Sequence, residues 1–213
     1  MKKILLIEDR IERQVHFTED TGINLKSYSD IIDNKIYFDK NELEKYSIII
    51  THRSAFGDYE ENILDYLKKY CEKTNTKLVF FSGGISATYY SKTKYEFLLL
   101  NSKSFYNKNL KLFLEDMKNR KEANLLILAY GNNWRINMML NTLAKINLFL
   151  DNNNSKEKVK FNNFKTVTKI ENIDSFVDIQ YPEVIKGGVL LEDLKNLASN
   201  ITLTIRREVE LYA

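Results

Sequence analysis

The stretch YSIIITHRS, residues 46–54, decides the fold class, because a short apolar run of strand length passes directly into polar residues. Three further stretches have the same form: KKILLIEDR (residues 2–10), KLVFFSGGIS (residues 77–86) and YEFLLLN (residues 95–101). Amphipathic segments of helix length separate them, so the apolar period alternates between that of a strand and that of a helix. This alternation predicts an α/β fold built on parallel strands.

The order of these segments defines the predicted layout of residues 1–120, the first domain. Strands are expected at residues 4–7, 48–51, 78–81 and 97–100, with a weaker strand between residues 25 and 38. Helices are expected at residues 41–46, 59–73 and 107–120. Right-handed crossovers between parallel strands favour a flavodoxin-like, doubly wound sheet, which carries its ligands at the carboxyl ends of its strands.

Residues 121–213 are predicted to form a C-terminal extension that is either α/β or helical. The apolar run NLLILAYG, residues 124–131, fits a strand or the first turns of a helix, and the break that follows favours a strand. Helices are expected over residues 134–148 and over residues 189–211, where apolar residues recur every three or four positions. Short strands are expected between them, at residues 158–161 and 165–170.

The composition excludes several classes of protein. The chain has 213 residues, a formal net charge of +3 with both signs scattered, and one cysteine, Cys71. Scattered charge gives little attraction to nucleic acid, and the first apolar run is too short for a signal peptide or a membrane span. A lone cysteine on a predicted helix indicates a reducing compartment. We therefore expect a cytoplasmic protein with neither a membrane nor a nucleic acid as its partner.

The run ILLIEDR, residues 4–10, resembles the first strand of a response-regulator receiver domain, in which an apolar run ends in an acidic pair that holds a divalent metal. In receivers the third strand ends in a phosphoacceptor aspartate, and the alignment places His52 at that position. Ser82 and Gly83 match the hydroxyl residue and the small residue that end a receiver's fourth strand, and Lys103 lies near the place of the family's lysine. The resemblance, over residues 1–120, implies a degenerate pseudo-receiver that works without phosphorylation.

The acidic pair and the histidine each have two open interpretations. Glu8 and Asp9 hold Mg²⁺, or they cap the following helix, whose positive end carboxylates stabilise. His52 is a poor magnesium ligand because hard cations prefer oxygen donors. It is either a structural histidine or a ligand contact, with acid/base chemistry if Glu8 or Asp9 approaches it across the sheet.

The glycine pair after the third apolar stretch is the sharpest local motif. If a helix follows the pair, free backbone N–H groups face an anion, as in phosphate-binding loops. The other interpretation is a tight turn. The predicted ligand-binding set consists of this loop and the end of the neighbouring strand: Ser82, Gly83, Gly84, Ser86, Thr51 and His52.

Two classes of function follow from these candidates. The first is a regulatory or interaction module whose strand-end crevice binds a small anionic ligand or is vestigial. Its protein partner is unidentified, and the regular apolar positions of the last helix also fit a homodimer. The alternative is an enzyme that acts on a phosphate-bearing substrate and uses His52 with Glu8 or Asp9.

Overall fold

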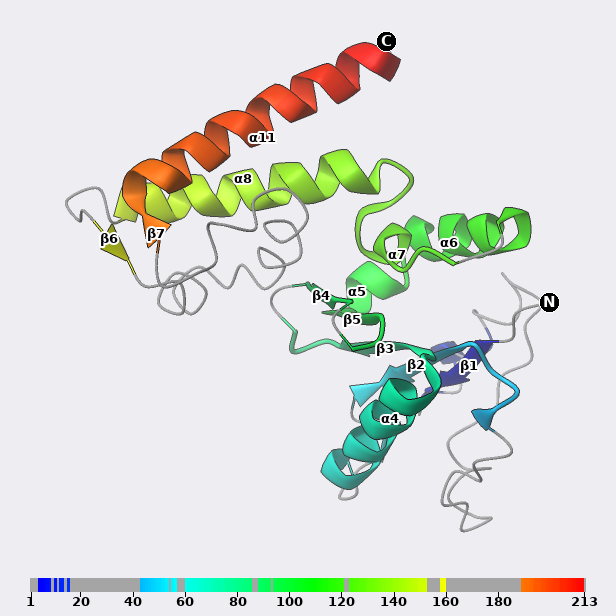
Figure 1. Ribbon diagram of the computed structural model, residues 1–213. Helices are drawn as coiled ribbons and strands as arrows, with labels where there is room; N and C mark the ends of the chain where they lie inside the picture. The colour runs from blue at the N-terminus through cyan, green and yellow to red at the C-terminus, as the bar shows by residue number, and fades with distance from the viewer. Residues whose placement is uncertain are drawn as a thin grey trace. The chain divides into compact units, whose positions relative to one another are not determined.

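The computed structural model describes residues 4–8, 10, 12–13, 15, 43–53, 55–56, 60–85, 88–92, 94–120, 123–152, 158–159 and 189–212. The chain divides into two compact units, residues 1–129 and residues 130–213, which are described separately (Figure 1). The sequence predicts this boundary at residue 120, before a short helix that is described below. The first unit contains all the candidate site residues.

A five-stranded sheet is the centre of the first unit. Its strands are β1 (Ile4–Ile7), β2 (Ile48–His52), β3 (Lys77–Ser82), β4 (Tyr89–Ser91) and β5 (Phe97–Asn101), in the spatial order β1-β2-β3-β5-β4. The strands β1, β2, β3 and β5 run parallel, and β4 pairs antiparallel with β5 at the edge. This arrangement confirms the predicted α/β class and the four parallel strands. The prediction worked because continuous apolar runs are typical of parallel strands that are buried on both faces. The strand order is compatible with a flavodoxin-like fold.

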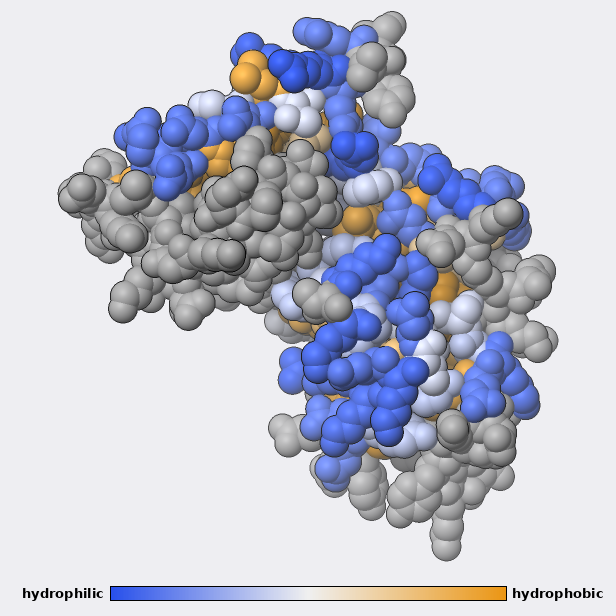
Figure 2. Space-filling view, viewed as in Figure 1, coloured by the Kyte–Doolittle hydropathy of each residue, from blue (hydrophilic) through white to orange (hydrophobic). Residues whose placement is uncertain are grey.

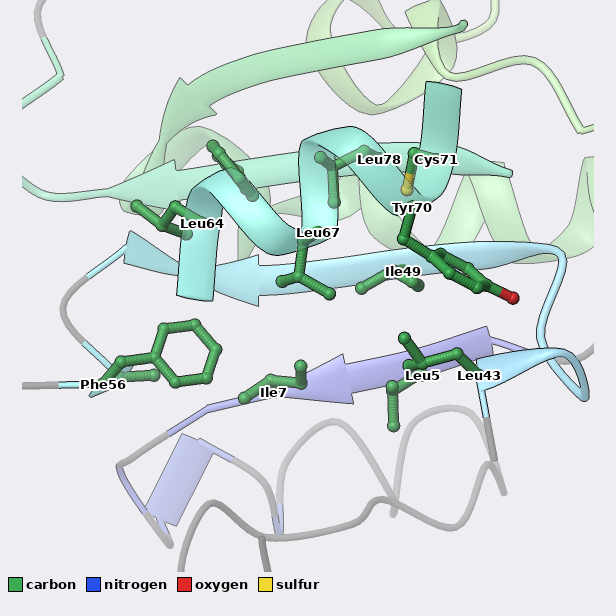
Figure 3. Close-up of a cluster of buried hydrophobic side chains, with 12 residues drawn as sticks. Leu5, Ile7, Leu43, Ile49, Phe56, Leu64, Leu67, Tyr70, Cys71 and Leu78 are labelled. Atoms are coloured by element: carbon green, nitrogen blue, oxygen red, sulfur yellow. The ribbon is translucent and has the colours of Figure 1, made fainter. Parts of the chain in front are cut away.

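Helix α4 (Glu60–Thr74) covers one face of the sheet (Figure 3). Its apolar residues Leu64, Leu67 and Tyr70 pack on strand residues that include Ile49 and Leu78. The predicted helix over residues 59–73 is therefore confirmed with its apolar face inward. Its polar positions face outward and give a mostly hydrophilic surface over α4 in Figure 2.

Two helices follow β5 and begin at asparagine caps. The side chain of Asn101 accepts a hydrogen bond from the backbone of Lys103 at the start of α5 (Ser102–Phe105). Asn107 accepts one from Asn109 at the start of α6 (Lys108–Asn119). The predicted helix over residues 107–120 is confirmed, whereas α5 is too short to give a periodic signal in the sequence.

The predicted strand at residues 124–131 is wrong, because this segment forms helix α7 (Leu126–Tyr130). The side chain of Asn124 accepts a hydrogen bond from the backbone of Leu126 at 3.1 Å, so Asn124 acts as the N-cap. Leu126, Ile127 and Leu128 are buried, and a short run without polar positions has no period that separates helix from strand. Gly131 then adopts a φ of 76°, which glycine tolerates, and ends the helix.

The glycine pair after β3 forms a tight turn, which is one of the two interpretations that the sequence left open. Gly83 and Gly84 form a turn closed by a 3.3 Å hydrogen bond from the backbone of Ile85 to that of Ser82. The next described element is β4, whose aromatic residues favour extended backbone. The geometry of a phosphate-binding loop, which requires a helix after the glycines, is therefore not formed by the described residues.

The second unit is built on two antiparallel helices, α8 (Trp134–Asn152) and α11 (Leu191–Tyr212), which lie side by side in Figure 1. Met139, Ile146 and Phe149 of α8 pack on a leucine-rich stripe of α11. Arg135 and Glu208 form an ion pair of 2.9 Å between the start of α8 and the end of α11. Strands β6 (Lys158–Val159) and β7 (Val189–Leu190) pair antiparallel. Both predicted helices are confirmed, and the predicted strand at residues 158–161 is confirmed at residues 158–159, while residues 160–161 lie outside the described residues.

Some predictions fall on other parts of the chain. The strands expected between residues 25 and 38 and at residues 165–170 lie outside the described residues, as does the start of the helix expected at residues 41–46. None of the described helices has the length and apolar character needed to cross a membrane.

Candidate functional site

The strand register brings two predicted site residues, Glu8 and His52, and their neighbour Phe81 to the same level of the sheet. Ile7, Thr51 and Phe80 are paired across β1, β2 and β3, so Glu8, His52 and Phe81 follow at the carboxyl ends of these strands. Because side chains alternate between faces, these three point to the face opposite α4. This placement agrees with the expectation that Glu8 and His52 lie at the carboxyl ends of their strands.

Glu8 is fully buried, with 0% of its surface exposed. Its Oε2 accepts a hydrogen bond of 2.6 Å from the hydroxyl of Tyr106, and its Oε1 accepts one of 3.3 Å from the backbone N–H of Arg10. Nη1 of Arg13 lies 3.6 Å from Oε2, which makes an ion pair but exceeds hydrogen-bond distance. Glu8 therefore binds one backbone N–H beyond β1, as a cap does, but from a buried position.

A series of aromatic contacts links Tyr106, the partner of this carboxylate, to His52. His52 is 7% exposed and packs against the ring of Phe81, with centroids 5.1 Å apart. Phe81 stacks on Phe105 at 4.3 Å and meets the ring of Tyr106 edge-on at 5.6 Å. We call these residues together with Glu8 and Arg13 the strand-end cluster. It joins the ends of three strands to helix α5 and the residue after it.

The other members of the predicted ligand set lie apart from this cluster or outside the described residues. Thr51 is buried on the α4 face, and its hydroxyl donates to the backbone oxygen of His52 at 3.2 Å. Gly83 and Gly84 are exposed in their turn. Asp9 and Ser86 lie outside the described residues.

The glycine turn is held by a residue that the sequence did not single out. Nδ2 of Asn101 donates to the backbone oxygens of Gly83 at 3.0 Å and of Ile85 at 2.8 Å. The same side chain caps α5, so it ties the turn to the helix that carries Phe105. Lys103, the candidate for the receiver lysine, is exposed on α5.

The described residues do not fit a magnesium site. Among them no group of three histidine, cysteine, aspartate or glutamate side chains lies close enough to hold a metal ion. Both carboxylate oxygens of Glu8 already accept hydrogen bonds, and the guanidinium of Arg13 places a positive charge beside them. That charge repels a divalent cation, so Mg²⁺ has no support from Glu8.

Sequence reasoning missed the residues that complete the cluster. Tyr106 lies 98 positions from Glu8 along the chain, and no local motif links the two. The only available signal is that residues 105–106 directly follow the predicted fifth strand, where the chain returns over the sheet. Arg13 lies in a polar segment whose charges looked like an ordinary solvated face.

Comparisons with known proteins add no assignment. No protein-family model matches the chain, and no curated protein or solved structure matches it either. The resemblance to receiver domains therefore stays a prediction, and the argument for function depends on the geometry of the strand-end cluster.

Proposed function

We propose that this chain is a regulatory or interaction module that works without phosphorylation and binds a small anionic ligand at its strand ends. The supporting observation is the environment of His52, which stands where the resemblance implies a phosphoacceptor. It is almost fully buried against Phe81, and it offers no carboxylate to an incoming phosphoryl group. Phosphoryl transfer also depends on a metal ion, which Arg13 disfavours beside Glu8.

The first test is exposure of the protein to small phosphoryl donors. We expect no stable gain of mass after incubation with acetyl phosphate and Mg²⁺, or with phosphoramidate, which phosphorylates histidine. Intact-mass spectrometry at neutral pH preserves an acid-labile phosphohistidine and so covers both chemistries. A stoichiometric gain of one phosphate that disappears in His52→Gln or in Asp9→Asn overturns the proposal.

The second test concerns the exposed glycine turn as a ligand contact. A Cβ added at Gly84 meets no heavy atom within 4 Å, so Gly84→Val leaves the packing of the protein intact. We expect this variant to lose any stabilisation that nucleotides or phosphorylated metabolites give the wild type in a thermal-shift screen, because the side chain blocks close approach to the backbone. If no such compound stabilises the wild type, the turn has no role in ligand binding.

An enzyme is the second candidate function, and one observation favours it. Glu8 and His52 are buried side by side at the ends of adjacent strands, which is a usual arrangement for acid/base chemistry. Hydrolysis of p-nitrophenyl phosphate by the wild type, and its loss in His52→Gln, would establish this alternative. Retention of the same rate in His52→Gln would assign the hydrolysis to a contaminant.

A further inference from the structure

One buried nitrogen atom of a partly exposed cation at the strand ends lacks a hydrogen-bond acceptor. Among the described residues, the buried side-chain atoms without a hydrogen-bond partner are Arg13 Nη1, Ser102 Oγ and Asp116 Oδ2. Only the first belongs to a positive group, and it lies in the strand-end cluster. A buried donor without an acceptor destabilises the fold, so such atoms are rare unless something else satisfies them.

The guanidinium of Arg13 is also held in position by two groups. Glu8 lies 3.6 Å from Nη1, and the ring of Tyr106 lies 5.6 Å from the guanidinium carbon in a cation–π contact. The Arg13 side chain keeps 29% of its surface exposed, so a ligand can reach it from solvent, although its Nη1 atom is buried. A guanidinium that is fixed before binding loses little conformational freedom when it binds an oxyanion.

Further cations lie at the same edge of the sheet. The exposed residues Arg10, Arg53 and Lys103 follow β1, β2 and β5. The described carboxylates at this edge include those of the buried Glu8 and the exposed Glu12, and α4 begins with two acidic residues, Glu60 and Glu61. Arg13 therefore lies among charges of both signs, in the place where α/β sheets bind ligands.

We infer that Arg13 anchors a phosphate group of a small molecule at the strand ends, with Glu8 and Tyr106 as the residues that position its guanidinium. This inference deepens the proposed function, on which it rests, by naming the chemical class of the ligand and the residue that recognises it. The fork of N–H donors on a guanidinium matches the oxygens of a phosphate, and charge-assisted hydrogen bonds of this kind are among the strongest.

Isothermal titration of the full chain with pyrophosphate at low ionic strength tests the inference. We expect the wild type to bind and Arg13→Gln to bind at least about 10-fold more weakly, since a hydrogen bond to a charged group is worth that much. Arg13→Lys keeps the charge but loses the fork, so its affinity should lie between the two. Arg120→Gln is the matched control, because Arg120 also pairs with a carboxylate, Asp116 at 2.6 Å, but on α6, and its affinity should not change.

The double variant Glu8→Gln with Arg13→Gln guards against misfolding, because it removes both charges of the buried pair together. We expect it to fold and to bind as weakly as Arg13→Gln. The inference is overturned if the wild type gives no binding heat, if either variant without Arg13 binds as tightly as the wild type, or if Arg120→Gln weakens binding equally. None of these outcomes bears on covalent phosphorylation, so they are separate from a failure of the proposed function.

Discussion

The two ends of one sheet face carry buried ion pairs that differ in how completely they are hydrogen-bonded. At the amino end of β3, the ammonium of Lys77 pairs with Glu96 and donates to the backbone oxygen of Ala123 at 2.6 Å. The hydroxyl of Tyr90 donates to the other oxygen of Glu96 at 3.2 Å. This amino-end cluster links β3, β4, β5 and the segment before α7 through contacts within the chain.

At the carboxyl end, the carboxylate of Glu8 is equally well bonded, but its cation is not. Tyr106 and the backbone of Arg10 satisfy Glu8, whereas Nη1 of Arg13 is buried without a hydrogen-bond acceptor. A closed cluster contributes to stability alone. This difference is the reason that we propose a ligand at the carboxyl end and assign the amino-end cluster a role in stability.

Replacement of Lys77, the cation of the amino-end cluster, should have the largest effect on the stability of the protein. In Lys77→Met the carboxylate of Glu96 stays buried without its cation, and the bond to Ala123 is lost. We expect the free energy of unfolding to fall by about 3 kcal/mol or more, as when one partner of a buried ion pair is removed. Urea denaturation followed by circular dichroism measures this loss.

The matched control is Lys68→Met, because Lys68 also pairs with a carboxylate, Asp65 at 3.3 Å, on the exposed side of α4. Exposed pairs of this kind contribute about 0.5 kcal/mol or less. If Lys77→Met is no more harmful than Lys68→Met, the amino-end cluster is not a stabilising element and the comparison of the two ends fails.

The hydroxyl of Tyr106 should have the next largest effect. Tyr106→Phe keeps the ring against Phe81 but removes the 2.6 Å bond to Glu8. We expect a loss of about 2 kcal/mol in the free energy of unfolding, the usual range for a hydrogen bond to a charged group. A double-mutant cycle with Glu8→Gln isolates this bond, and its loss should be clearly smaller in the Gln background. Equal losses in both backgrounds would show that the two residues do not interact.

The sequence was sufficient for the elements whose pattern is local. The parallel strands were predictable because apolar runs such as Ile48–His52 are uninterrupted and end at polar residues. Parallel strands bring their carboxyl ends to one edge of the sheet, so the sequence also predicted that Glu8 and His52 lie at the same edge. Helix α6 was predictable because Asn107 begins a regular amphipathic period.

What the sequence could not supply depends on contacts that are distant along the chain. Strand β4 is only three residues long, and it forms because Tyr89 and Tyr90 pair with β5. The sequence around it has no alternating apolar pattern that would predict a strand. Segment α7 was mistaken for a strand because its five residues are short for a helix and include no strongly polar side chain that would show a helical period. The Arg13–Glu8–Tyr106 arrangement needs α5 to return over β1, so its residues looked unrelated.

Loss of the Arg13 side chain should affect stability less than loss of Lys77. In Arg13→Gln the carboxylate of Glu8 keeps both of its hydrogen bonds, and Arg13 is partly exposed and beyond hydrogen-bond distance of it. We expect a loss of about 1 kcal/mol in the free energy of unfolding, near the value of a partly exposed ion pair. Denaturation of Arg13→Gln beside Lys77→Met checks the order, and a loss as large as that of Lys77→Met would make Arg13 a structural residue like Lys77.

The smallest expected effect concerns a buried titratable group on the other face of the sheet, the thiol of Cys71. Burial raises its pKa from 9.0 to about 12. Below its unfolded pKa the thiol is protonated in both states, but above it the unfolded thiol ionises while the folded one does not, so stability is lost as the pH rises from about 9 to about 12. At about pH 9.5 this loss is roughly 0.8 kcal/mol relative to neutral pH. The variant Cys71→Ala is less stable than the wild type at neutral pH because it loses packing, but its stability should fall by that much less over the same interval. Parallel slopes for the two proteins would show that the thiol ionises in the folded state, which would contradict its placement beneath α4 as a closed, structural group.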